Sequence, residues 1–521
     1  MVTVTSSASE RQFSRSDSSD RDLSVPATVG LMKVEADIVV VGGGSSGAAV
    51  AGLLAAAGRD VILLEAGPDY GPATSGRWPA ELLDARMLAT THDWNYTSGP
   101  VSGREPWTFE RARVIGGCSA HNGAIAAVGH RQDYDGWGLA GWSTDELRPA
   151  FARVIERMRV RTYDRGEARA FHARCLDVAT ALSWTMKSDL CDLDANTSFG
   201  LESVNVTADG MRWNTAFAYL DPVRHLPNLR IIDEVLVDRL VDHANGATIH
   251  AQRHGDPFTV AAGTVVLSCG VYGTPAILQR SGVGDPTRLS AASVATVVDL
   301  PGVGGNLHDH PMIHSDREIG PVLAAEFVAA MAAGFLPEEQ TLGKAMSSQA
   351  TDGIFDLHIF PIGVSTQTAL VGGRVLVEVA CVTPLSRGRL DIVSPDPTVA
   401  PRIDHGYLTD DDDHDIAVLR DGLAMADEML DHPLLAPLLG QRLTDVSNDA
   451  AIRRQVLHYY HPVGTCRMGA DEFAVCDSRG RVRGLDHVVV ADASLMPQIP
   501  RANTNLPSIV IGEQIAATLL E

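Results

Sequence analysis

The stretch that most limits what this chain can fold into is ADIVVVGGGSSGAAVAGLLAAAGRDVILLEAG, residues 36–67. The β-branched run Asp37 to Val41 predicts a strand buried on both faces. An alanine-rich helix follows and ends near Gly58, and Val61 to Leu64 predicts a second buried strand. Strand, tight turn, helix and strand in this order are typical of the first unit of a parallel, doubly wound α/β sheet.

Three glycines and one acid indicate what this unit binds. Gly42, Gly44 and Gly47 form a G-x-G-x-x-G pattern: the first permits the turn, the second lets a pyrophosphate approach the backbone, and the third lets helix and strand pack closely. Glu65 follows about 18 positions after the last glycine, where a ribose hydroxyl acceptor is expected. An acid there disfavours a 2′-phosphate. The stretch therefore predicts a dinucleotide other than NADP, and by itself it leaves FAD and NAD open.

Composition excludes several other classes of protein. The chain has 521 residues, which predicts two domains or one large domain with an insertion, and its net charge of −23 argues against nucleic acid and anionic membranes as partners. Seven cysteines without a C-x-x-C pair argue against a disulfide scaffold or a cysteine zinc site and favour reduced thiols in the cytoplasm. Residues 1–34 have no apolar core of a signal peptide and are expected to be a flexible tail. No apolar run reaches the length of a membrane span.

The rest of the chain alternates strand and helix patterns. A meander is expected over 235–242, 247–253 and 258–260, then a separate buried strand over 264–268, and a long amphipathic helix over 412–430. Near the end we expect a strand at 488–491 and a helix at 508–520. We assign 35–155, 201–311 and 455–521 to a discontinuous nucleotide-binding domain. We assign 156–200 and 312–454 to a second, α+β, substrate-binding domain.

Two polar side chains near the end of the chain are candidates for catalysis. His461 lies in YYHPVGT and Asn505 in RANTNLP, both expected in loops. An imidazole with a pKa near about 6.5 accepts an alcohol proton at neutral pH, and an amide beside it holds the substrate oxygen without competing for the proton. A histidine that caps a turn and an asparagine in an Asx turn are the structural alternatives.

Other candidate centres are weaker. His308 and His310 in LHDHP lack a third ligand at a recognisable spacing, so a loop role is expected and no metal is predicted. Ser45, Ser46 and Ser119 lie in no G-x-S-x-G elbow, which argues against a hydrolase.

Several stretches, in the right order, resemble the glucose–methanol–choline (GMC) family of FAD-dependent alcohol oxidoreductases. The resemblance runs over nearly the whole chain from about Ala36. Its motifs are Arg111 to Asn122 with GGCSAHN, Gly270 to Gly284 (which departs from the family at Val271), Pro301 to Gly304 with NLHDH, His461 to Thr465, and Ala491 to Ser494.

The resemblance implies FAD rather than NAD, and a Rossmann-type FAD-binding domain of the GMC type with a substrate domain over the flavin ring. It implies that His461 is the base or proton-handling histidine, with Asn505 as its partner and His358 as a further active-site histidine. Asp492 and Ala493 correspond to a loop that contacts the flavin. Taken together, motif and resemblance assign to the cofactor Gly42, Gly44, Ser45, Ser46, Gly47, Glu65, Ala66, Arg113, Gly116, Gly117, Ser119, His121, Asn122, Gly123, Val235, Asp492, Ala493, Asn503 and Asn505.

Within the family, the chain is most similar to the choline-oxidase branch, with one informative departure. His121 occupies the position that carries a covalent bond to the flavin 8α-methyl in that branch, so covalent FAD is a hypothesis here. Where the branch has a glutamate for a quaternary ammonium group, this chain has Met312, and no aromatic cage is recognisable. We therefore expect a neutral alcohol or a sugar-like polyol as substrate.

The expected reaction is proton abstraction from a CH–OH group and hydride transfer to flavin N5, with O₂ reoxidising the flavin to give peroxide. A dehydrogenase with a quinone or protein acceptor, a non-redox flavin-containing lyase, and a module that only binds FAD are the alternatives. A homodimer also stays open.

Overall fold

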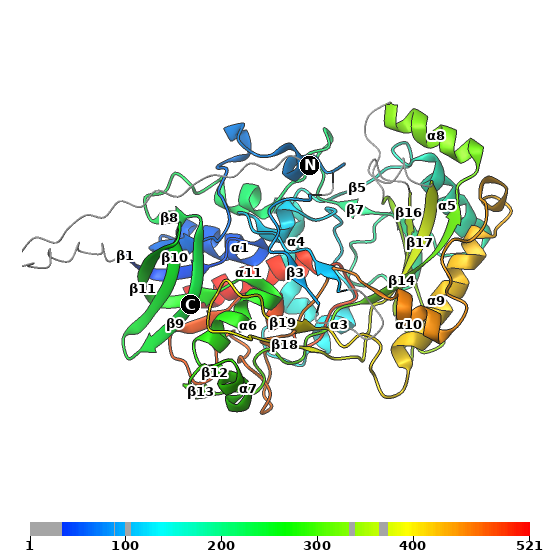
Figure 1. The fold of residues 1–521 in the computed structure, drawn as a ribbon. Helices are drawn as coiled ribbons and strands as arrows, with labels where there is room; N and C mark the ends of the chain where they lie inside the picture. Colours follow the sequence, from blue (N-terminus) through cyan, green and yellow to red (C-terminus); the bar gives the residue numbers. More distant parts are fainter. Residues whose placement is uncertain (1–33, 88, 99–105, 333–338, 364–372) are drawn as a thin grey trace, which may run out of the picture. The chain divides into compact units, whose positions relative to one another are not determined.

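A computed structural model describes residues 34–87, 89–98, 106–332, 339–363 and 373–521. The predicted flexible tail, apart from Val34, lies outside the described residues. The described chain contains one mainly parallel sheet of seven strands and one antiparallel sheet of six (Figure 1). The predicted fold class, an α/β nucleotide-binding domain with a second sheet, is confirmed. The domain limits stay a prediction.

The parallel sheet is built on the strands predicted from the glycine motif. β8, β2, β1 and β11 lie side by side in that order and are parallel, and β10 and β9 extend the sheet as an antiparallel meander. β21 also pairs with β11 in parallel. The bounds are β1 Val34–Val41, β2 Val61–Leu64, β8 Leu229–Ile232, β9 Val235–His243, β10 Gly246–Arg253, β11 Asp256–Leu267 and β21 Val488–Val490.

One prediction for this sheet is wrong. The strands expected at 258–260 and 264–268 are a single strand, β11, which pairs with β1 along one edge. Its other edge pairs first with β10 and then with β21. Gly263 allows this continuity, because a Cβ there would lie 2.7 Å from the carbonyl oxygen of Asp37. Gly263, which lies between the two predicted strands, thus permits a close backbone approach within one strand.

Two long helices pack against each other beside this sheet. α1 (Ser45–Ala56) follows the glycine turn, and α11 (Asn505–Leu520) returns to it. Ser46 Oγ donates to the Ser508 carbonyl at 2.6 Å, and a Cβ at Gly512 would lie 2.6 Å from the Ser46 carbonyl oxygen. The helices therefore touch through their backbones. α11 begins three residues before the predicted start, so Asn505 is its first residue and does not lie in a loop.

The second sheet has strand order β20-β14-β17-β16-β15-β6 and is antiparallel throughout. Its strands are β6 Ser198–Leu201, β14 Pro311–Glu318, β15 Thr341–Ala345, β16 Leu357–Ile362, β17 Arg374–Cys381 and β20 Leu457–His458. Residues such as Leu357 and Ile359 form one apolar core with α5 (Ala170–Ala181) and α9 (His414–Leu430), and Figure 1 shows α9 along this sheet. The predicted helix at 412–430 is confirmed. β20 belongs to this sheet although it lies inside the segment assigned to the nucleotide domain.

One cross-strand row on the opposite face of the second sheet is important for the site. Pairing aligns Leu457, Met312, Ala380, His358 and Lys344 across five strands. Directly opposed residues in antiparallel strands share a face. His358, Met312 and Lys344 therefore point to the same side of the sheet, away from α9.

The remaining elements are short or connect these parts. They are α2 Ala80–Leu83, β3 Tyr96–Thr97, β4 Thr108–Phe109, α3 Arg131–Asp135, α4 Thr144–Arg157, β5 Arg161–Thr162, β7 Ser203–Val204, α6 Gly270–Arg280, β12 Val283–Gly284, α7 Pro286–Ala291, β13 Val298–Asp299, α8 Pro321–Ala332, β18 Arg389–Asp391, β19 Arg402–Asp404 and α10 Asp449–Gln455. Short 3₁₀ turns include Gly117–Ala120 and Ala493–Leu495, and Ala216–Leu220 is a π-helical turn. Within the described residues, no helix is both long enough and apolar enough to cross a bilayer.

Candidate active site

Two glycine turns meet in front of α1. A Cβ at Gly117 would lie 2.5 Å from Gly44 Cα, and a Cβ at Gly47 would lie 1.9 Å from the Gly42 carbonyl oxygen. Gly44 is different, because a Cβ there would meet only Gly117 Cα, at an ordinary 3.7 Å. Gly47 and Gly117 are thus required by packing. Gly44 leaves open space where the sequence places a pyrophosphate.

Glu65 is tied to the first glycine turn. Its carboxylate accepts the backbone N–H groups of Gly43 and Gly67, both at 2.8 Å. Burial raises the pKa of the Glu65 carboxyl to about 7, although these backbone N–H groups act to lower it. Glu65 therefore shapes the loop that begins the nucleotide site, and contact with a ribose stays a prediction.

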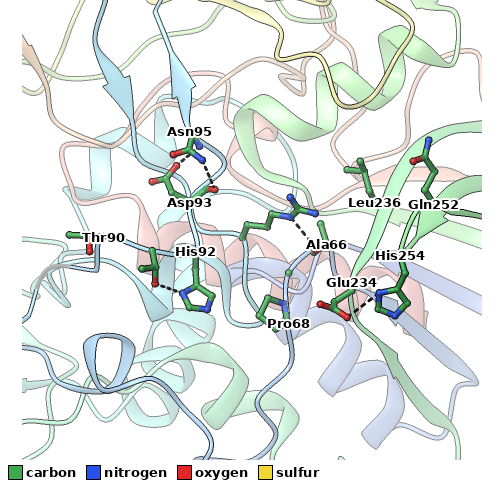
Figure 2. Close-up of a pocket in the computed structure, with 14 residues that line it drawn as sticks. Ala66, Pro68, Thr90, His92, Asp93, Asn95, Glu234, Leu236, Gln252 and His254 are labelled. Carbon is green, nitrogen blue, oxygen red and sulfur yellow. Dashed lines mark hydrogen bonds and ion pairs between the residues drawn. The ribbon is translucent and has the colours of Figure 1, made fainter. Parts of the chain in front are cut away.

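A cavity of about 620 Å³ opens beside this loop (Figure 2). Ala66 and Arg113 from the predicted cofactor set line it, and Arg113 Nε donates to the Ala66 carbonyl at 3.1 Å. Glu234 and Leu236, on either side of predicted Val235, also line it, and Figure 2 shows Glu234 paired with His254. None of its lining residues is a catalytic candidate, whereas Ala66 and Gly67 follow Glu65 directly, so the cavity fits part of a dinucleotide site.

The first residues of α1 and α11 meet at Asn505. Ser45 Oγ donates to Asn505 Oδ1 at 2.8 Å, while Asn505 Nδ2 is buried without a partner in the structure. Two helix N-termini thus lie together and offer positive dipole ends to one acceptor. Asn505 is joined to the dinucleotide loop, and its pairing with His461 stays a prediction.

His461 lies in a group of buried rings. His310 Nδ1 and His461 Nδ1 are 3.2 Å apart, and the ring of Tyr459 meets the His461 ring edge to face at 4.5 Å between centroids. The Tyr459 ring also lies 6.2 Å from His358, which stacks on Phe355. The structure therefore brings together two predicted histidines and a third, His310, for which only a loop role was expected.

These three histidines are uncharged at neutral pH. Burial lowers the pKa of His461 and of His358 well below the usual value, and the neighbouring imidazoles lower the pKa of His461 further. Burial lowers the pKa of His310 to about 3. A neutral imidazole can accept a proton, so the cluster has the protonation state that a general base needs.

The cluster also holds buried polar atoms without partners. Buried polar groups are nearly always hydrogen-bonded in folded proteins, so a local group of unpaired atoms indicates the place of a ligand. Those near His461, or at and just before the start of α11, are His310 Nε2, both ring nitrogens of His358, the Tyr459 hydroxyl, Asn503 Oδ1 and Asn505 Nδ2.

Comparison with known proteins decides the family. Residues 36–312 and 384–512 match the two family models described as GMC oxidoreductase. The chain is 32% identical over 533 residues to an oxygen-dependent choline dehydrogenase of Pseudomonas syringae pv. tomato, covering 92% of this chain and 93% of the relative. The chain belongs to the GMC oxidoreductase family.

The structural comparison agrees in fold. The GMC chain superposes on pyridoxine 4-oxidase from Mesorbium loti with a TM-score of 0.80 at 24% identity, over 92% of this chain and 98% of that one. Formate oxidase gives a TM-score of 0.78 at 21% identity, covering 94% and 98%. By its family models and its choline dehydrogenase relative, the protein is a GMC-type enzyme of the class that oxidises CH–OH groups, for which FAD is the typical cofactor. The predicted family and enzyme class are confirmed.

Several predicted cofactor residues of this GMC enzyme have structural contacts. Ser119 Oγ donates to the Gly116 carbonyl at 2.6 Å and accepts from the Thr215 N–H, and Asn122 Oδ1 accepts from Ala124. His121 Nε2 lies 3.1 Å from the Thr91 carbonyl oxygen, which it reaches as an N–H donor. A Cβ at Gly123 would lie 3.3 Å from Glu339 Oε2.

The predicted Asp492–Ala493 turn is joined to α6. The Asp492 carboxylate accepts from the N–H of Gly270, from the Thr274 hydroxyl and from the N–H of Ser494. This explains why the second family signature and the Ala491–Ser494 motif occur together, since one carboxylate joins them. Contact of Asp492, Ala493, Val235 or Asn503 with the flavin stays a prediction.

Sequence reasoning missed residues that organise the site from a distance. Arg212, fully buried, donates to the carbonyls of Glu81, Leu82, Met87 and Asn122, and so fixes the loop next to His121. No local pattern around a single arginine distinguishes this role.

Two further groups of possible metal ligands have structural contacts. His308 Nδ1 donates to the Asn306 carbonyl and His308 Nε2 accepts from Ile499, so both its nitrogens are used. Cys381, His414 and Asp415 also approach one another, but the Asp415 carboxylate accepts the backbone N–H groups of Leu385 and Ser386.

Proposed function

We propose that this GMC enzyme oxidises a small, uncharged alcohol, with His461 as the group that takes the hydroxyl proton. The observation that carries this proposal is the buried, neutral His461 among unpaired polar atoms. Bound FAD would supply the chemistry that the side chains lack, namely acceptance of two electrons and a hydrogen from the alcohol carbon. The open space at Gly44 and the unpaired Asn505 Nδ2 fit that cofactor.

The contact between His310 and His461 supports this role for His461. One of the two facing Nδ1 atoms must carry the hydrogen. The proposed role of His461 as a base places that hydrogen on His461 Nδ1 and leaves a lone pair on His310 Nδ1. His461 Nδ1–H then donates to His310, and His461 Nε2 keeps the lone pair that a base needs.

The substrate preference follows from the face of the second sheet that carries His358. Met312 gives this face an apolar side chain, and Lys344 adds a buried ammonium in the same cross-strand row. The Lys344 Nζ lies 5.0 Å from the Phe355 ring centroid, and burial lowers its pKa to about 8, so it stays mostly charged at pH 7. An amine-bearing alcohol would be repelled by that charge. A neutral alcohol is therefore proposed although some relatives are named for choline.

We further propose O₂ as the electron acceptor, supported by relatives that are named oxygen-dependent dehydrogenases or oxidases. A dehydrogenase with a quinone or protein acceptor is the second candidate. A panel of neutral, cationic and anionic alcohols tests both, with anaerobic loss of the oxidised flavin absorbance as the first readout. Peroxide release on adding air supports the oxidase, and reduction of an artificial dye alone supports the dehydrogenase. A flavin that no alcohol bleaches would overturn the proposal in favour of a lyase or an FAD-binding module.

Covalent attachment of FAD through His121 is proposed as well. The donation from Nε2 to Thr91 leaves His121 Nδ1 with its lone pair, which a bond to carbon requires. Acid precipitation tests this: yellow protein is expected in the pellet. Colour only in the supernatant would exclude the bond.

A further inference from the structure

We propose that Asp309 is a positioning residue for the oxidation: its carboxylate holds the His310 and His461 backbones together and so sets the contact between their imidazoles. This inference rests on the proposed role of His461. No motif assigned a role to Asp309, whose side chain does not touch either imidazole in the described structure.

One carboxylate oxygen joins two distant segments. Asp309 Oδ1 accepts the N–H of His310 at 2.8 Å and the N–H of His461 at 2.9 Å, although Asp309 and His461 are 152 positions apart. Asp309 Oδ2 accepts the Tyr407 hydroxyl at 2.9 Å. The Asp309 side chain is 2% exposed, so water does not replace these bonds.

The geometry explains why a shared oxygen matters. The two backbone N–H groups that donate to Asp309 Oδ1 belong to His310 and His461. The imidazole Nδ1 atoms of the same two residues lie 3.2 Å apart. Without the carboxylate, both buried N–H groups would lose their acceptor, which is costly in a folded core. The flanking backbone pairs His308–Val463 and Pro311–His458 would keep the two segments together. The His461 backbone between them would lose its fixed orientation, and its imidazole would lose its fixed direction toward the substrate.

A half-buried arginine completes the arrangement. Arg111 lowers the pKa of Asp309, opposing the larger effect of burial, which raises it to about 6. Arg111 Nη2 also donates to the Tyr460 carbonyl at 3.1 Å, one residue before His461. Asp309 and Arg111 therefore hold the same turn from adjacent backbone groups.

The test compares Asp309→Ala with Asp309→Asn in the FAD-loaded enzyme. Asparagine keeps an oxygen that can accept both backbone N–H groups, whereas alanine removes it. Displacement of a reacting group by about 1 Å can cost about 10²-fold in rate. We expect alanine to lower the limiting rate of flavin reduction by about 10²-fold, with little change in the alcohol concentration at half-saturation, and asparagine to restore the rate to within about tenfold of wild type.

Asp415 provides a matched control. It is also fully buried and also accepts two backbone N–H groups, but it lies in α9 and bonds Leu385 and Ser386 instead of the histidine segments. Asp415→Ala should lower the melting temperature as Asp309→Ala does, and should leave the limiting rate near wild type in the folded fraction. Tyr407→Phe, which removes only the bond to Oδ2, should lower the rate by about threefold.

The outcomes separate this inference from the function itself. An Asp309→Ala enzyme that binds FAD and keeps the wild-type limiting rate overturns the positioning role. An Asp309→Asn enzyme whose limiting rate is as low as that of Asp309→Ala overturns it too. Asparagine keeps the accepting oxygen, so the loss of rate would then come from the missing charge and not from a change in geometry. If Asp309→Ala does not fold, the asparagine and Tyr407→Phe rates still decide. A wild-type flavin that no alcohol reduces would instead refute the proposed function.

Discussion

The nucleotide end of this enzyme is formed mainly by backbone atoms, and the histidine end is formed by side chains. At the nucleotide end, backbone atoms of two glycine turns and two helix N-termini shape the site, and Gly44 and Gly117 touch without side chains. At the histidine end, four side chains from three distant segments meet in a buried cluster: His310, His358, and Tyr459 with His461. Binding of a phosphate needs close backbone approach, whereas proton transfer needs side chains with a tuned pKa.

This difference has a consequence for mutation. A change in the glycine turns acts through steric contact and therefore on folding or FAD affinity. A change in the histidine cluster acts on the rate of the chemical step while the cofactor stays bound. Variants at the nucleotide end should therefore change stability or FAD affinity, and variants at the histidine end should change the rate of flavin reduction.

The largest effect is expected at Gly47. Gly47→Ala places a Cβ 1.9 Å from the Gly42 carbonyl oxygen, so the turn must move, and we expect a protein that contains no FAD and has lost about 1–3 kcal/mol of stability. Gly44→Ala, which meets only Gly117 Cα at 3.7 Å, should fold normally yet bind FAD weakly. Thermal melts of the apo-protein and FAD titration separate the two. Equal melting temperatures for both variants would contradict this account.

His461→Ala should come next. Loss of a general base typically costs about 10²–10⁴-fold, so the limiting rate of flavin reduction should fall by that factor while FAD content stays full. Stopped-flow reduction under anaerobic conditions measures it, with exposed His225 replaced by alanine as the control. A His461→Ala enzyme that is reduced at the wild-type rate would remove His461 from the mechanism.

Asn505→Ala tests which end this residue serves. Its bond to Ser45 predicts an effect on FAD affinity of about 1 kcal/mol, or about a fivefold rise in Kd, with little change in the rate of reduction. The sequence-based role as the partner of His461 predicts the opposite, a slower reduction at unchanged affinity. FAD titration and stopped-flow reduction of the same variant decide between them.

The smallest effect is expected from pH. Burial lowers the pKa of His461 below its usual value of about 6.5, so the base stays unprotonated until the pH falls below that value. The limiting rate should therefore be flat from about pH 6.5 to 8 and decrease only in more acidic solution. A rate that halves at or above pH 6.5 would show that the cluster is more exposed to water than the structure indicates.

Folding stability should depend on pH in the same direction. A histidine whose folded pKa lies below its unfolded value favours the folded state above the unfolded pKa, and that contribution is lost as the pH falls below about 6.5. Glu65 acts oppositely, because its folded pKa of about 7 exceeds the unfolded value of 4.5, so its contribution is lost as the pH rises between them.

The glycine motif allowed much of the first sheet to be predicted. Strand, turn and helix are local consequences of residues 36–67, and β2 was predicted to the residue. The sequence could not show that β11 is one strand, because its continuity depends on the close approach of Asp37 to Gly263. Asn505 was placed in a loop because helix N-termini are weakly marked when Thr504 and Asn505 both resemble turn residues.

The histidine cluster could be predicted only in part. His461 was a candidate from its own chemistry and His358 from family resemblance, but His310, Tyr459 and Asp309 join them through contacts between segments about 150 positions apart, and no local pattern reports such contacts. Burial also decides the pKa of each imidazole, and burial of a single histidine cannot be read from its neighbours in sequence.

The pairing of α1 with α11, and of β11 with β21, has a consequence for how the enzyme is made in the cell. The glycine turn leaves the ribosome early, whereas its packing partners, residues 488–520, are synthesised more than 400 residues later. Until α11 has been synthesised, the nucleotide pocket of the nascent chain is incomplete, because Ser45 and Ser46 lack their hydrogen-bond partners in α11. Cofactor loading should then be a post-translational event, and a prematurely terminated chain should emerge colourless even though it carries the complete dinucleotide motif.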